Sequence, residues 1–366
     1  MGPDLIMDAM LDPTVLQTLW FALIAFFFLG YFVLEGFDFG VQMNLAASWR
    51  KGSRSRGTLL STIGPVWDGN EVWVITGGAL LFAAFPEWYA TLFSGFYLAL
   101  LLLLLVLIVR VCAFKWRSKV DSERWRTAWD VVHVIGGFAP ALLWGVAIAN
   151  IVAGVAIDEN HWVTTPLLGL LNPFALLGGL VFVLLFFLHG TLYLTLKVEG
   201  PLREDAHRRA AILVWPTIAA GAAFLLWYQL AHSRTLLTLI PLALAALALV
   251  AVVPLVRRRR EGLAFGATTL AISGAVVTLF GGLFPYVLPA TNDPANSLTV
   301  VNASSTEHTL TVMLVALCIL LPVVLAYTFW TYRVFRHRVA DEDSPAPGET
   351  LRHTLVDGYR RAFEQE

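Results

Sequence analysis

Nine apolar stretches dominate the sequence, and each is near or above the roughly 20 residues that a helix needs to cross a lipid bilayer. Hydrophobic residues make up 58% of the chain and charged residues only 14%, whereas soluble domains carry about 25% charged residues. A soluble fold of this size cannot bury so much apolar surface, so lipid must cover part of it. The stretches are 14–47, 58–85, 88–114, 128–152, 173–197, 209–232, 235–256, 263–289 and 308–335.

The basic residues predict an orientation for these stretches. All Lys and Arg residues except Arg234 fall in every second connection or in the C-terminal segment, with Arg110 assigned to the same side at the end of the third stretch. Cytoplasmic loops of membrane proteins carry an excess of Lys and Arg. We therefore predict that the N-terminus lies outside the cell and the C-terminus in the cytoplasm.

Helices are the expected form of these stretches, because backbone polar groups in lipid must satisfy one another within the segment. The sequence predicts an all-α integral membrane protein with nine transmembrane helices. The transmembrane domain covers residues 1–336, and residues 337–366 form a cytoplasmic tail.

A short internal echo links the first and fifth stretches. Residues 32–36 read FVLEG and residues 186–190 read FFLHG. The echo would suit two four-helix units followed by a final helix. A chance similarity between two apolar helices explains it at least as well.

Four carboxyl groups are predicted at bilayer depth. Glu35 and Asp38 share one helix face, as do Asp68 and Glu71, because each pair is three residues apart. Counted from the cytoplasmic ends, Asp38 and Asp68 lie about 13–15 Å deep and Glu35 and Glu71 about 17–20 Å deep. No Lys or Arg is expected beside them. Such groups can hold a proton and pass it on, as a proton relay requires; alternatively, they hydrogen-bond and lock helices together.

Asp68 lies in a distinctive string, residues 64–73 (GPVWDGNEVW). Pro65 frees a backbone carbonyl, so water or a side chain can enter the helix. Trp67, Asn70 and Trp73 add hydrogen-bonding groups, and we expect them to line the path that protons would take past these acids.

Two histidines, His133 and His189, lie within the fourth and fifth stretches. Histidine ligates haem iron, but no two histidines share a helix face at metal-ligand spacing. A packed or hydrogen-bonded role is therefore favoured for both, and no metal site is predicted. The net charge of −1 also argues against a polybasic nucleic-acid binder.

Four segments resemble subunit II of the cytochrome bd-type quinol oxidases. They are Gly36–Val41, Pro65–Gly78 (PVWDGNEVWVITGG), Leu80–Tyr97, and Arg117–Asp130 with its basic residues and tryptophans. Weaker similarity continues through residues 171–174, 284–285 and 302–305. The resemblance covers nearly the whole chain.

The resemblance implies a bacterial plasma-membrane protein with two four-helix bundles, at about 14–152 and 173–289, plus a peripheral ninth helix at about 308–335. It also implies that haem b and haem d belong to a partner, subunit I, that quinol and lipid are further partners, and that this chain is not catalytic alone. By position, Asp68 and Glu35 match proton-path carboxyls and Trp67 matches a position near the subunit interface. Glu35 departs from the Asp of some relatives. The family also implies possible small single-span accessory subunits and a quinone.

Two other functions fit midplane acids. A proton-coupled secondary transporter uses them to couple protons to substrate movement, although such transporters usually show inverted repeats, and the echo here has the same orientation in both copies. A purely structural subunit would use the acids only to fix assembly.

Overall fold

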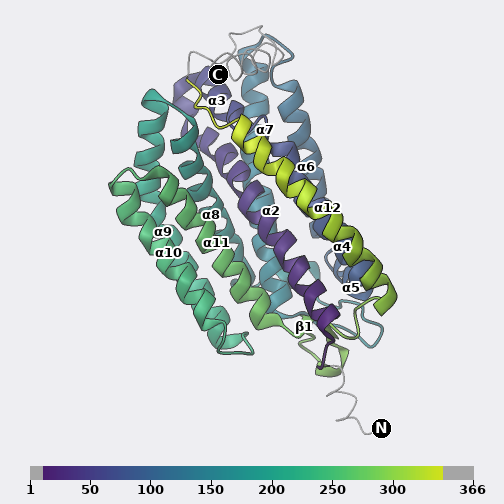
Figure 1. Cartoon of the computed structure of the whole chain (residues 1–366). Coiled ribbons are helices and arrows are strands. Elements are labelled where there is room, and N and C mark those ends of the chain that lie inside the picture. The colour runs from purple at the N-terminus through teal and green to yellow at the C-terminus, as the bar shows by residue number, and fades with distance from the viewer. Residues whose placement is uncertain (1–10, 341–366) are drawn as a thin grey trace, which may run out of the picture.

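The computed structural model describes residues 11–340, and helices account for most of this part of the chain (Figure 1). Short 3-10 turns and a small hairpin occupy the connections. The α-helices are α2 (Val15–Ala47), α3 (Gly52–Ser61), α4 (Trp67–Ala84), α5 (Pro86–Gly95), α6 (Tyr97–Trp116), α7 (Glu123–Ala153), α8 (Pro173–Lys197), α9 (Gly200–Ala231), α10 (Leu239–Arg257), α11 (Glu261–Leu283) and α12 (Glu307–Val334), and the strands are β1 (Tyr286–Leu288) and β2 (Leu298–Thr299).

The prediction of an all-α membrane protein is confirmed. Among residues 11–340, 8 helices are long and apolar enough to cross a membrane, and the pair α4 and α5 gives up to 9 if it counts as one span. The first, fifth and ninth predicted stretches agree with α2, α8 and α12 to within a residue.

The second and third stretches differ from the prediction. The second is not one helix, because α3 ends at Ser61 and α4 begins only at Trp67. Pro65 lacks a backbone N–H and disfavours helical geometry at Gly64, which accounts for the break. The third stretch begins as α5, which is bent by 120° from α4, and the straight span α6 starts only at Tyr97.

Helix α2 occupies the centre and packs against α4, α7 and α8. Helices α9 and α11 pack against α8, and α10 packs against α9 and α11. Glycine allows the closest approach: a Cβ on Gly40 would lie 1.9 Å from the carbonyl oxygen of Phe186 and 2.8 Å from the Cα of Gly190. The echo motifs of α2 and α8 also meet, because a Cβ on Gly36 would lie 2.7 Å from the ring of Phe186. The division into two four-helix bundles stays a prediction.

The basic connections meet at one end of the helices, which we call the basic end. Ion pairs join Lys51 to Asp205, and Arg259 to Glu204 at 2.5 Å. Arg117 donates to the carbonyl oxygen of Ser53 at 2.7 Å. The opposite end holds the β1–β2 hairpin, which precedes α12.

Residues 335–340 form a strap that crosses the basic end. Val339 pairs with Val198 in a parallel bridge, and its N–H donates to the carbonyl oxygen of Lys197 at 2.7 Å. The start of the predicted tail at residue 337 is therefore fixed against α8. The rest of the predicted tail, residues 341–366, lies outside the described residues.

Candidate functional site

Three of the four predicted carboxyls surround a buried arginine between α2, α4 and α6. Arg110 Nη1 lies 2.5 Å from Glu35 Oε1 and 3.6 Å from Glu71 Oε1. The side chains of Glu35, Asp38 and Arg110 are fully buried, and that of Glu71 is 13% exposed. We call these four residues the acid cluster.

The expectation that no basic residue lies beside the acids is wrong. Arg110 stands just inside its predicted helix and counts there with the cytoplasmic basic residues, yet α6 turns it inward, over the rings of Phe39 and Phe114. Gly136 of α7 leaves room for its stem, since a Cβ there would lie 3.1 Å from the Arg110 side chain. The sequence does contain a signal for this buried position, because Arg110 is flanked by apolar residues on both sides.

The charges of the acid cluster do not balance. One guanidinium faces three carboxyl groups in a low-dielectric setting, where an uncompensated charge is costly. At most one carboxylate is neutralised, so the remaining carboxyls are favoured as protonated acids. Within residues 11–340, neither oxygen of Glu35 and neither terminal nitrogen of Arg110 has a well-aligned hydrogen-bond partner.

A polar chain leads from Asp38 to α12. Asn70 Nδ2 donates to Asp38 Oδ2 at 2.8 Å and to the carbonyl oxygen of Leu34 at 3.2 Å. The hydroxyl of Tyr332 donates to Asn70 Oδ1 at 2.6 Å. Asn70 is among the predicted site residues and Tyr332 is not, because a tyrosine near the end of a transmembrane helix usually marks the membrane interface.

A second polar chain leads from Arg110 to His133. Arg110 Nε donates to Gln42 Oε1 at 2.9 Å, and Gln42 Nε2 lies 2.9 Å from His133 Nδ1. Both Gln42 and His133 are fully buried. His133 therefore belongs to a polar network that ends at the acid cluster.

Asp68 lies outside the acid cluster, although it interacts electrostatically with Glu71, three residues further along α4. It stands in the first turn of α4 and is exposed on the surface of the chain. The helix that carries Asp68 begins at Trp67 rather than at residue 58, and the predicted depth of Asp68 in the bilayer stays a prediction. A carboxylate suits the first turn, where the helix dipole favours negative charge.

The three other polar residues of this motif point inward. Trp67 stacks on Phe114 with the rings 4.6 Å apart, Trp73 packs against Phe27, and Asn70 is 1% exposed. Their side chains lie inside the chain, beside the acid cluster and α2.

His189 has both ring nitrogens engaged. Nδ1 lies 2.7 Å from Thr268 Oγ1, Nε2 lies 3.2 Å from the carbonyl oxygen of Val33, and the ring stacks on Phe265. It offers no open nitrogen to a haem iron, and His133 is enclosed edge-on by Phe114. No group of three metal-ligating side chains occurs among the described residues. Of the two predicted histidines, His189 has both nitrogens engaged, whereas His133 Nε2 is buried without a hydrogen-bond partner among residues 11–340.

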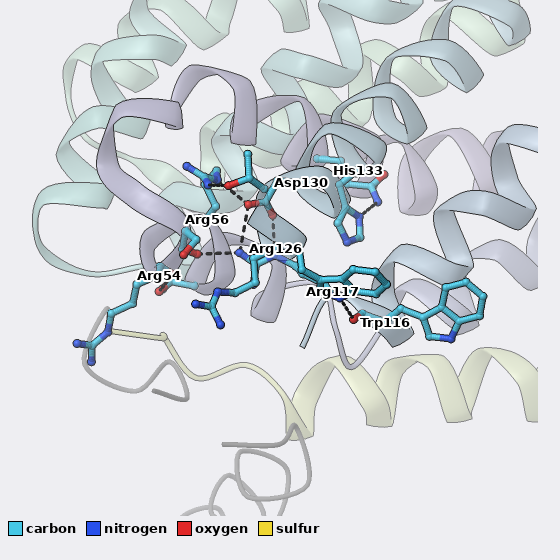
Figure 2. A network of polar contacts seen from close by, with 12 residues as sticks. Arg54, Arg56, Trp116, Arg117, Arg126, Asp130 and His133 are labelled. Carbon is cyan, nitrogen blue, oxygen red and sulfur yellow. Dashed lines mark hydrogen bonds and ion pairs between the residues drawn. The ribbon is translucent and has the colours of Figure 1, made fainter. Parts of the chain in front are cut away.

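Two arginines, Arg56 and Arg117, pair with Asp130 at the basic end of the molecule. Figure 2 shows Arg56 and Arg117 converging on Asp130, which is fully buried at the start of α7. Arg56 Nε lies 2.7 Å and Arg117 Nε 2.6 Å from the carboxylate. These contacts tie α3, α6 and α7 together between the basic end and the acid cluster.

Comparison with known proteins gives consistent results. The sequence model of a family described as cytochrome bd terminal oxidase subunit II matches residues 16–335. The chain is 37% identical over 332 residues to cytochrome bd ubiquinol oxidase subunit 2 of Bacillus subtilis, covering 90% of this chain and 98% of that protein. It is 33% identical over 371 residues to cytochrome bd-I ubiquinol oxidase subunit 2 of Escherichia coli, covering 91% and 98%.

A solved structure shows the same fold. The bd oxidase from Geobacillus thermodenitrificans superposes with a TM-score of 0.71 at 20% identity, covering 88% of this chain and 99% of the matched chain.

Proposed function

The chain belongs to the cytochrome bd terminal oxidase subunit II family, and we propose that it supplies protons to a haem-bearing subunit I that reduces oxygen to water. It is thus a component of a quinol oxidase, an oxidoreductase complex. We further propose that the chain alone is not catalytic.

Haem b and haem d belong to the partner in this proposal, where they oxidise quinol and reduce oxygen. The engaged nitrogens of His189 and the enclosed ring of His133 support this division. We also propose that this chain forms two four-helix bundles. The haem sites then lie in subunit I. Quinone, lipid and small single-span subunits are further proposed partners.

The orientation is proposed from the basic end. Ion pairs and hydrogen bonds bring the Lys- and Arg-rich connections together there, and such segments face the cytoplasm in bacterial plasma membranes. The N-terminus then lies outside and the C-terminus in the cytoplasm.

The proton route is proposed to run from the basic end through Asp68 and Asp38 to Glu35, with Glu71 beside it. The observation that carries this proposal is the acid cluster, in which three carboxyls share one arginine. Carboxyls that charge balance favours as acids can release and regain protons near neutral pH. Trp67, Asn70 and Trp73 line the inner side of this route.

Purification of the full chain with an affinity tag tests the assignment. We expect a haem-bearing protein to co-purify and the complex to absorb visible light, whereas the chain expressed alone should be colourless. A proton-coupled transporter would instead purify colourless and alone. A colourless chain from cells that express a functional quinol oxidase would contradict the proposal.

Asp68→Asn should slow oxygen consumption by the assembled complex several-fold while leaving its haem spectrum unchanged. Asp68 is exposed on α4, and the proposal requires subunit I to cover it, because a carboxylate facing lipid is costly. Oxygen uptake with excess quinol measures the rate, and Asp121→Asn, at an exposed site in the α6–α7 connection, is the control. Equal rates in the two variants would remove Asp68 from the route.

A further inference from the structure

Tyr332 reaches the acid cluster from α12, a helix that otherwise lies on the outside of the molecule (Figure 1). Its hydroxyl donates to Asn70 Oδ1 at 2.6 Å, and its ring lies edge-on to Phe37 with the centroids 6.3 Å apart. Within residues 11–340, Asn70 is the one side chain that donates a well-aligned hydrogen bond to Asp38.

The amide of Asn70 has two possible orientations, with opposite effects on Asp38. With its nitrogen toward Asp38, the amide donates a hydrogen bond and favours the carboxylate; with its oxygen toward Asp38, it accepts one and favours the acid. Tyr332 donates to the amide oxygen, and the carbonyl oxygen of Leu34 accepts from the nitrogen at 3.2 Å. Both contacts select the orientation in which Asn70 donates to Asp38.

The strap holds this end of α12 in place. Lys197 Nζ donates to the carbonyl oxygens of Phe335 and, at 2.9 Å, of His337. Arg338 Nη2 lies 2.8 Å from Glu261 Oε2. These contacts begin three residues beyond Tyr332, so they fix the position of its hydroxyl relative to α4.

We propose that Tyr332 is a positioning residue for Asp38, which sets the orientation of the Asn70 amide and thereby the pH range over which Asp38 exchanges its proton. This inference rests on the proposed proton route. The charged and titratable groups that interact with Asp38 are Glu35 on α2, Arg110 on α6, Tyr193 on α8 and Tyr332 on α12. Glu71 on α4 lies 3.6 Å from Arg110 Nη1.

Tyr332→Phe in the complete complex tests the proposal. The phenyl ring keeps the contact with Phe37, so the complex should assemble with an unchanged haem spectrum. Oxygen consumption should fall several-fold, and its pH profile should move to higher pH by about half a unit, because the carboxylate of Asp38 loses part of its hydrogen bonding. Tyr327→Phe is the matched control, since Tyr327 is 60% exposed on the same helix, and it should match the unsubstituted complex.

Asp38→Asn separates this inference from the proposed function. If Asp38→Asn slows turnover and the double variant Asp38→Asn/Tyr332→Phe shows no additional pH shift, the inference is supported. If Asp38→Asn slows turnover but Tyr332→Phe retains the original rate and pH profile, the inference is overturned and the route stands. Unchanged turnover in Asp38→Asn overturns both.

A substitution in the strap tests the inference if the Tyr332→Phe complex does not assemble. Arg338→Gln removes the contact with Glu261 from outside the bundle and should move the pH profile in the same direction by a smaller amount. An unmoved profile in this variant would overturn the inference.

Discussion

Replacing Arg110 by Met should prevent the complex from accumulating. The substitution keeps an unbranched apolar stem but removes the guanidinium, which leaves Glu35 and Glu71 without their cation and Gln42 without its donor at 2.9 Å. Removing one partner of a buried ion pair typically costs about 3–5 kcal/mol, because the remaining charge is uncompensated. We expect little or no assembled oxidase, measured as haem absorbance in solubilised membranes.

Two further variants test whether the missing charge of Arg110 causes this loss of assembly. Arg124→Met, at an exposed position in the first turn of α7, should accumulate normally. Arg110→Met/Glu35→Gln should recover part of the lost assembly, because one carboxyl is removed together with the cation. Normal accumulation of Arg110→Met alone would show that the acids do not need the arginine, and would contradict the described charge balance.

Glu35→Gln should assemble but slow oxygen consumption by on the order of tenfold or more, the scale of losing a positioned proton-transfer group. Glutamine matches the shape of the glutamic acid form and keeps an oxygen that can face Arg110, but it cannot release a proton. Glu35→Asp keeps the acid with one methylene fewer and should retain more activity than Glu35→Gln. Oxygen uptake is compared at equal haem content.

The control for this series is Glu159→Gln, at an exposed position in the connection between α7 and α8. It should consume oxygen at the unsubstituted rate. A Glu35→Gln complex that turned over as fast as this control would leave Glu35 with a structural role only.

Much of the fold could be predicted because lipid imposes simple rules. Helix length, apolar composition and the placement of Lys and Arg locate α2, α8 and α12 to within a residue of their observed bounds. Composition did not reveal the break between α3 and α4 or the 120° bend at α5. Pro65 and Pro86 mark both places, but a proline is compatible with a kinked continuous helix as well as with a break.

Three of the four predicted acids lie together, but their surroundings were not predicted. Glu35, Asp38 and Glu71 come together because α2 and α4 pack side by side. The position of Arg110 depends on the rotation of α6 about its own axis, which the placement of basic residues does not specify. Tyr332 was missed for a related reason, because its contact with Asn70 joins residues 262 positions apart.

Proton uptake by the reduced complex on mixing with oxygen tests the central claim most directly. A pH-sensitive dye in weakly buffered medium follows the protons, and haem absorbance follows the electrons in the same sample. We predict that Glu35→Gln slows proton uptake by the same factor as steady-state turnover, while oxygen binding keeps its original rate. Proton uptake as fast in Glu35→Gln as in the unsubstituted complex would contradict the proposed route.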